Sequence, residues 1–185
     1  MSIFNISNRY ASALFRLAED SDKFDKIAGD MDLVFNTLEA SKELRNLLVS
    51  PVITEAKKKS ILSELFDDKV SAETQNFLKF VVTKNREDML FDISKRFIEL
   101  RDDKLNIVNA NISTAVEVTG NEKKLFEESL ASYTGKKVRL NFNIDEKIIG
   151  GFRVKIKDKL IDASVFHQLE LLRKRLVSED RSLVN

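Results

Sequence analysis

The residue types that most often carry catalysis are scarce in this chain of 185 residues. It contains one histidine, His167, and no cysteine, so it lacks a thiolate nucleophile and has too few ligands for a zinc site of the usual kind. The carboxylate pairs Asp102-Asp103 and Glu127-Glu128 are adjacent in sequence, so neither pair shares a helix face, and we expect them to be solvated rather than catalytic. His167 is expected to be structural. There is no GxxxxGK(S/T), GxGxxG or HExxH motif, so we predict neither a catalytic site nor a cofactor or metal site.

Basic side chains are the remaining candidates for chemistry. The 31 basic and 30 acidic residues nearly cancel, so no global field attracts nucleic acid. A local patch is nevertheless predicted on the wet face of a sheet, from these residues: Lys136, Lys137, Arg139, Arg153, Lys155, Lys157 and Lys159. Such a face could reach phosphates, which makes a nucleic-acid-binding adaptor one hypothesis. No aromatic residue lies among the basic ones on that face, so a stacking platform for single strands is missing.

The first hundred residues are predicted to be helical, because only Gly29 and Pro51 interrupt them before Gly120. Helical spacing and capping residues predict six helices. The first covers about 3–19, the second runs from a Ser21-Asp22 cap to Leu38, and the third covers 41–49. The fourth starts at Thr54, the fifth starts at Ser71, and the sixth covers about 87–104. Ser50-Pro51 ends the third helix. On the fourth helix, the run from Lys57 to Lys59 is expected to face solvent.

The first and fifth helices carry more apolar surface than one packing face requires. Counted at about 100° per residue, their apolar side chains span roughly 200° of the circumference, about twice what a helix packed on one side needs. Two explanations remain open. Each helix lies centrally in its own bundle, or part of each arc binds another chain.

The hydrophobic period changes from helical to alternating at Leu105, and we place a domain boundary there. A strand is predicted over 108–118, a helix from Gly120 to a C-cap at Gly135, and a second strand over 138–144. A strand over 152–157, a short return segment at 160–161 and a last helix capped by Ser164 follow. The predicted fold is an N-terminal six-helix bundle (1–105) followed by a small C-terminal α+β domain (106–185). The leucines of the last helix are expected to be core rather than interface: Leu169, Leu172 and Leu176.

The most specific pattern in the chain runs from Lys147 to Leu176. A hydrophobic pair, Gly150-Gly151, an alternating basic strand, Ile161-Asp162 and a helix with Leu169-Glu170-Leu171-Leu172 follow one another. This string resembles the carboxy-terminal signature of the delta subunit family of the F-type ATP synthase, related to the mitochondrial oligomycin-sensitivity-conferring protein. Three earlier segments resemble the same family in the same order: Tyr10 to Leu14, Leu48 to Ile53 and Asn76 to Val82. Lys157 and Ala163 stand where the family often has glycine.

The resemblance implies a non-catalytic stator subunit, which links the alpha/beta head of the F1Fo ATP synthase to the b subunits of the peripheral stalk. It implies that the helical bundle receives the amino-terminal helix of an alpha subunit in a groove between its first and fifth helices, and the excess apolar arcs independently fit that groove. The candidate groove residues are Tyr10, Ala13, Leu14, Leu17, Phe77, Phe80 and Val81. Some of these residues are expected to be core. An aspartate at position 14 or 81 is expected to abolish the contact and leave the fold intact, and a variant that unfolds instead would assign its residue to the interior. The C-terminal domain, with signature residues Gly150, Gly151 and Asp162, is implied to meet the b subunits.

The resemblance also implies a location. No run approaches the roughly 18 apolar residues of a membrane span, so no direct membrane insertion is expected. The stretch from Met1 to Asn5 does not resemble a targeting leader, which favours a peripheral subunit at the cytoplasmic face of a bacterial inner membrane. We expect the free subunit to be monomeric and to bind no nucleic acid. A self-associating helical scaffold that uses the same two-helix groove is a further hypothesis.

Overall fold

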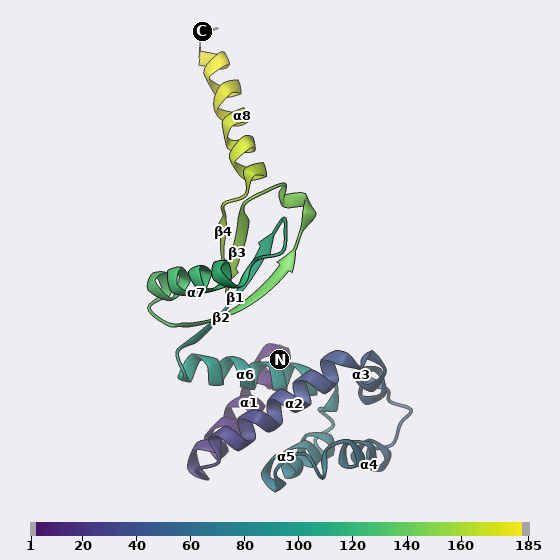
Figure 1. Ribbon diagram of the computed structural model, residues 1–185. Helices are drawn as coiled ribbons and strands as arrows, with labels where there is room; N and C mark the ends of the chain where they lie inside the picture. The colour runs from purple at the N-terminus through teal and green to yellow at the C-terminus, as the bar shows by residue number, and fades with distance from the viewer. Residues whose placement is uncertain (1–2, 183–185) are drawn as a thin grey trace. The chain divides into compact units, whose positions relative to one another are not determined.

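The computed structural model describes the backbone of residues 3–182 and the side chains of residues 3–174 (Figure 1). The chain divides into two compact units, Met1–Leu105 and Asn106–Asn185. Each unit has its own cluster of buried apolar side chains.

The first unit is helical. Its helices are α1 (Ile3–Asp20), α2 (Phe24–Ala40), α3 (Lys42–Val49), α4 (Glu55–Phe66), α5 (Ala72–Thr83), the short 3-10 helix η1 (Glu87–Met89) and α6 (Leu90–Lys104). The hydroxyls of Ser41 and Thr54, where these two helices were predicted to start, accept hydrogen bonds from backbone N–H groups and so cap α3 and α4. Ser50 is extended before Pro51, which ends α3. The main packing partners are α1 with α6, α2 with α6, and α4 with α5.

The predicted cap of α2 at Ser21-Asp22 is wrong. The helix begins after Lys23, which provides no side-chain cap. Asp22 adopts a left-handed conformation with φ of 54° between α1 and α2. The hydroxyl of Ser21 donates to the carbonyl of Leu17 at 2.7 Å and so serves the end of α1 instead.

A carboxylate from α2 caps the start of α5. Oδ2 of Asp30 accepts hydrogen bonds from the backbone N–H of Ser71 at 2.8 Å, from the Ser71 hydroxyl at 2.5 Å and from the Thr74 hydroxyl at 2.8 Å. All three residues are buried. The orphan N–H group at the start of α5 is therefore satisfied by a side chain about forty residues earlier in the chain, and α2 determines where α5 starts.

Two buried ion pairs correct expectations about charged residues. Asp102, expected to be solvated, is only 3% exposed and binds Arg101 at 3.1 Å, and Arg101 also pairs with Asp32 on α2. Burial alone would lower the pKa of Arg101, but the hydrogen bonds and charges of Asp32 and Asp102 raise it. Lys58 was expected to face solvent within its lysine run. It is 4% exposed, and its Nζ lies 2.7 Å from Glu87 at the start of η1.

The second unit is a four-stranded mixed sheet with the strand order β2-β1-β3-β4. Its elements are β1 (Ile107–Thr114), α7 (Gly120–Thr134), β2 (Lys137–Ile144), the 3-10 helix η2 (Glu146–Ile148), β3 (Phe152–Ile156), β4 (Lys159–Asp162) and α8 (Val165–Ser182). Thr119 and Glu122 form a capping box at the start of α7, and Gly135 with φ of 65° ends it. β1 is shorter than predicted, because the hydroxyl of Thr114 bonds to the carbonyl of Val116 and turns the chain.

One face of the sheet is apolar and is covered by α7 (Figure 1). The ring of Phe126 on α7 meets Phe142 and Phe152 edge-on, with centroids 5.9 and 5.0 Å away. The other face is polar, with Ser113 and Asn111 of β1 hydrogen-bonded to Asn143 and Asn141 of β2. This alternation is the pattern that the sequence predicted.

Two predictions about the second unit are wrong. Lys159 pairs with Ile156, so it lies on the same sheet face as α7 and not on the wet face with Lys155. Leu169 and Leu172 of α8, expected in the core, are 54% and 53% exposed. The side chain of Leu176 lies outside the described residues. None of the described helices has the length and apolar character needed to cross a membrane.

Lys58→Met is expected to destabilise the first unit by about 3–5 kcal/mol, because it leaves the Glu87 carboxylate buried without a cation. Within the described residues, Glu87 Oε2 already lacks a hydrogen-bond partner. The double variant Lys58→Met/Glu87→Leu should recover most of that loss. Urea unfolding followed by circular dichroism measures both, with the exposed neighbour changed in Lys57→Met as the control. Equal stability of the Lys58 and Lys57 variants would contradict this role for the pair.

Candidate functional site

The apolar arc of α1 divides into a buried row and an accessible row. The buried row contains Ser7, Ala11, Leu14 and Ala18. The accessible row beside it contains Ile6, Tyr10, Ala13 and Leu17. At about 100° per residue, the two rows are roughly 100° apart around the helix. Ile6 and Tyr10 are partly buried against the core, whereas Ala13 is exposed and Leu17 is 46% exposed, so the unit covers this row only in part.

α5 is arranged in the same way. Its buried row contains Thr74, Leu78, Val81 and Val82. Phe77 is half-buried beside that row and Phe80 is 48% exposed. The rings of Tyr10 and Phe80 have centroids 6.2 Å apart, so the accessible flanks of α1 and α5 meet. We call these two flanks together the α1/α5 surface: Tyr10, Ala13, Leu17, Phe77 and Phe80.

Two of the predicted groove residues belong to the interior. Leu14 is 1% exposed and Val81 is 0% exposed, and both lie in the core cluster of the first unit. An aspartate at either position would bury an unpaired charge, so the expectation that such variants stay folded is wrong. The excess apolar arc seen in the sequence is therefore partly core and partly surface.

The glycine pair of the second unit has a structural explanation. Gly151 has a φ of 77°, and a Cβ there would lie 2.4 Å from the carbonyl oxygen of Ala163. The chain on either side is bonded to the segment after β4, with the N–H of Val165 donating to the carbonyl of Gly150 at 2.9 Å. Gly151 therefore allows the entry to β3 to approach the exit from β4.

Asp162 closes the same junction. Its Oδ1 accepts hydrogen bonds from the Ser164 hydroxyl at 2.6 Å and the Ser164 N–H at 3.0 Å, and its Oδ2 lies 3.0 Å from Nε of Arg153. These bonds to Ser164, with the help of Arg153, lower the pKa of Asp162. The hydroxyl of Ser164 in turn accepts from the N–H of His167 and caps α8, as predicted. The signature residues thus fix the strand-to-helix junction.

No arrangement of side chains for catalysis is found in the described part of the chain. His167 is half-buried, and its backbone N–H takes part in the cap of α8. Within residues 3–174, no three His, Asp or Glu side chains gather as metal ligands. What both units offer instead is apolar surface on helices, which suits contact with other chains.

The chain is similar to known proteins over nearly its whole length. Residues 6–176 match the family model described as the ATP synthase delta (OSCP) subunit. The chain belongs to this family. The ATP synthase subunit delta of Chlorobium phaeovibrioides is 41% identical over 96% of this chain and 98% of its own length. That of Chlorobium luteolum is 37% identical, over 97% and 99%.

A solved structure shows the same fold. A chain of the Toxoplasma gondii mitochondrial ATP synthase hexamer superposes with a TM-score of 0.74 at 24% identity, and the match covers 92% of this chain and 97% of that one. Family and fold together make this protein a structural stator component of ATP synthase rather than a catalytic subunit. The nucleic-acid hypothesis is not supported. Its predicted basic patch is smaller than expected, because Arg153 is paired with Asp162 and Lys159 lies on the other face of the sheet.

The sequence interpretation missed an apolar row on α7. Leu125 and Tyr133 are 61% and 64% exposed. They lie two helical turns apart on one side, with Ser129 between them. Plotting α7 by residue angle, as for the first and fifth helices, would have revealed this row.

Gly151→Ala is expected to destabilise the second unit. The positive φ alone costs an alanine about 1–3 kcal/mol, and the clash of its Cβ with the backbone of Ala163 adds to that cost. Gly150→Ala is the matched control. Its Cβ would meet only the side chain of Val165, with Cγ2 at 3.2 Å and Cβ at 4.0 Å, and a side chain can shift. Amide hydrogen exchange of β3 reports the difference, and equal protection in the two variants would contradict the close approach.

Asp162→Asn is expected to cost the second unit about 1–2 kcal/mol at about pH 7, since the charge-assisted bonds to Ser164 and Arg153 are weakened. The pKa of Asp162 is lowered in the folded chain, so its stabilisation is present above the unfolded pKa of about 3.9 and is lost as the pH falls through the folded value. The difference between wild type and variant in hydrogen exchange or urea unfolding should therefore shrink below about pH 3.9. A difference independent of pH would show that Asp162 acts only through its shape.

Proposed function

We propose that the first unit docks the amino-terminal helix of an alpha subunit on the α1/α5 surface. The second unit, in this proposal, contacts the b subunits of the peripheral stalk. The subunit would act at the cytoplasmic face of a bacterial inner membrane as the joint between head and stalk. The contact with the alpha subunit is proposed from one observation: α1 and α5 present accessible apolar side chains next to each other, where Tyr10 meets Phe80.

The chemistry of the α1/α5 surface suits a helix with one apolar face. Accessible residues recur along α1 at spacings of three and four, which is the register in which a second helix packs. Lys84 at the end of α5 has its Nζ 5.5 Å from the centre of the Phe80 ring, so a cation borders the apolar surface. The expected occupant therefore has apolar residues at helical spacing and can carry a carboxylate beside Lys84.

The free energy of covering single side chains indicates that the proposed contact must extend over the whole α1/α5 surface. Leu17 and Phe80 are each about half exposed, so covering either one contributes roughly 1 kcal/mol. Association costs about 4–15 kcal/mol in lost freedom of motion. Two anchors cannot offset that cost, and the contact must extend over Tyr10, Ala13, Phe77 and the first turns of α1, where Ile3 and Phe4 are 59% and 60% exposed.

The same surface could instead pair two copies of this chain. Two identical α1/α5 surfaces would make an isologous dimer that leaves nothing exposed for an alpha subunit. Light scattering of the free protein separates these functions, because the stator function expects a monomer and the scaffold hypothesis expects a dimer.

The full-length protein should bind a peptide of the amino-terminal alpha-subunit segment from the same organism in a one-to-one complex. Leu17→Asp and Phe80→Asp should each weaken that binding on the order of tenfold or more in calorimetric titration, since each places a charge within the contact. Val52→Asp is the control, because Val52 is 87% exposed and lies outside α1 and α5. Leu14→Asp is expected to unfold the unit in circular dichroism.

Absence of binding by the folded wild-type protein would overturn the alpha-subunit contact. Binding that Leu17→Asp and Phe80→Asp leave unchanged would move the contact to another face of the first unit.

A further inference from the structure

The second unit contains a groove between α7 and the β3–β4 hairpin. Two hollows, of about 600 and 440 Å³, adjoin there. Both are lined by Tyr133 and Ile161, so they are neighbours, and we call the two hollows together the α7 groove. It is distinct from the α1/α5 surface, which belongs to the other unit.

Most of the length of the α7 groove is apolar. Its floor and walls along α7 and β3 are formed by Leu125, Phe126, Leu130, Phe152 and Val154. Phe126 and Leu130 face the sheet and complete its core, whereas Leu125 and Tyr133 stand beside them and stay exposed. The distance from Leu125 to Tyr133 along the helix axis is about 12 Å, or two turns. A groove of this length and character accommodates several turns of an amphipathic helix.

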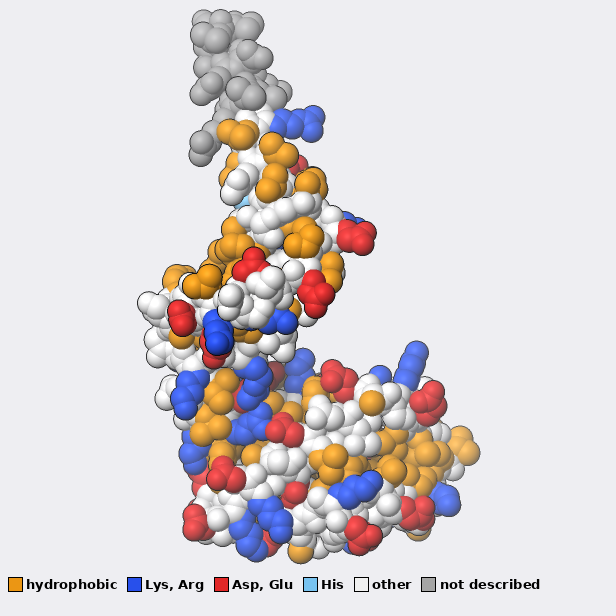
Figure 2. Space-filling model, viewed as in Figure 1, with side chains coloured by type: hydrophobic (Ala, Val, Ile, Leu, Met, Phe, Trp, Pro, Cys, Tyr) orange, Lys and Arg blue, Asp and Glu red, His pale blue; other side chains and the backbone are white. Residues whose placement is uncertain are grey.

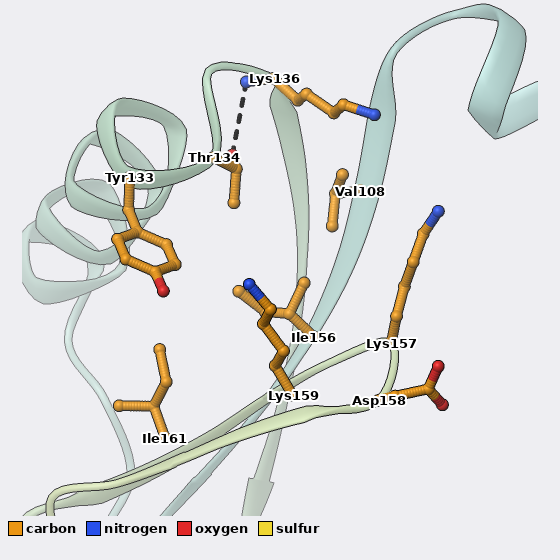
Figure 3. A pocket seen from close by; sticks show the side chains of 9 residues that line it. All are labelled: Val108, Tyr133, Thr134, Lys136, Ile156, Lys157, Asp158, Lys159 and Ile161. Carbon is orange, nitrogen blue, oxygen red and sulfur yellow. Dashed lines mark hydrogen bonds between the residues drawn. The ribbon is translucent and has the colours of Figure 1, made fainter.

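One end of the α7 groove is cationic. Lys136, Lys157 and Lys159 border the end near the β3–β4 turn, with Asp158 as the one acidic lining residue there. Figure 3 shows the amino group of Lys159 and the hydroxyl of Tyr133 pointing into the hollow, while Lys136 and Lys157 reach its rim and the carboxylate of Asp158 points away. The surface therefore complements a ligand that is apolar along its length and anionic at one end.

We propose that the α7 groove docks an amphipathic helix of a partner protein, with the carboxyl-terminal end of that helix at the lysines. A helix carries partial negative charge and free carbonyl groups at its carboxyl end, and acidic side chains there add to that charge. Three lysines beside an apolar floor favour this direction over the reverse, in which the positive amino-terminal end would face them. A small anion would use only the lysine end and leave the apolar row uncovered.

This inference rests on the proposed contact between the second unit and the b subunits, and it adds the site and the direction of the bound helix. α8 is the other apolar candidate in the unit, and its exposed side chains are visible in Figure 2. α8 shows exposed leucines, and Arg173 and Lys174 follow Glu170 along it. The α7 groove combines shape and charge, so we assign the contact to it.

The test is calorimetric titration of the full-length protein with the soluble segment of the b subunits from the same organism. Leu125→Glu should weaken binding on the order of tenfold or more, because it places a carboxylate in the apolar groove. Leu160→Glu is the matched control. Leu160 is 59% exposed, close to the 61% of Leu125, but it pairs with Lys155 on the opposite face of the sheet.

Charge reversal tests the direction. Lys136→Glu/Lys159→Glu should weaken binding on the order of tenfold at low salt, and this effect should shrink at about 1 M salt, where charges are screened within about 3 Å. Lys124→Glu/Lys155→Glu makes the same change in net charge on the outer side of α7 and on the polar sheet face, and should change binding less than twofold. A b segment whose last acidic residues are replaced by their amides should lose its sensitivity to the Lys136/Lys159 reversal.

The outcomes separate the two proposals. If the wild-type protein binds the b segment and the groove variants bind it equally well, the α7 groove is not the site and the stalk contact stands. If the folded wild-type protein does not bind the b segment, the stalk contact itself fails and the groove assignment fails with it. If Leu125→Glu weakens binding but the lysine reversal does not, the groove is occupied and the proposed direction is wrong.

Discussion

The three hydrogen bonds to the carboxylate of Asp30 hold α5 in place against α2. A helix start needs acceptors for its free N–H groups, and here the acceptor comes from another helix rather than from the preceding loop. If this carboxylate were lost, buried hydroxyl and amide groups would be left unsatisfied and α5 could shift. Phe80, opposite Tyr10 in the α1/α5 surface, lies on the helix that this cap begins.

Other ion pairs join further helices of the first unit. Lys58 joins α4 to η1, and Arg101 joins α6 to α2 through Asp32. Such pairs contribute little net free energy compared with apolar residues of the same shape, but a missing partner is costly. They therefore favour one packing arrangement over others. For the proposed joint between head and stalk a single arrangement would be an advantage, because a joint that repacked would absorb the force.

Both units leave apolar helix surface uncovered, and the reason is geometric. α1 and α5 each carry a wider apolar arc than their neighbours in the unit can cover, and α7 packs Phe126 and Leu130 on the sheet while Leu125 and Tyr133 stay exposed. Uncovered apolar surface is a liability for a free protein and an asset for a permanent subunit. The chain belongs to the ATP synthase delta (OSCP) subunit family, whose members are non-catalytic structural subunits of the complex.

The sequence by itself determined the order of the α-helices and strands, the change of period at Leu105, the helix starts at Ser41 and Thr54, and the cap at Ser164. It also indicated a positive φ or a close backbone approach at Gly150-Gly151. Each of these depends on residues a few positions apart, because caps, turns and periodicity are short-range. Only the tertiary structure decided that Leu14 is interior while Leu17 is surface, that Lys58 is buried, that Lys159 faces α7 and that Asp30 caps α5. These outcomes depend on neighbours that are distant in sequence, and an apolar or charged residue carries no local sign of what will pack against it.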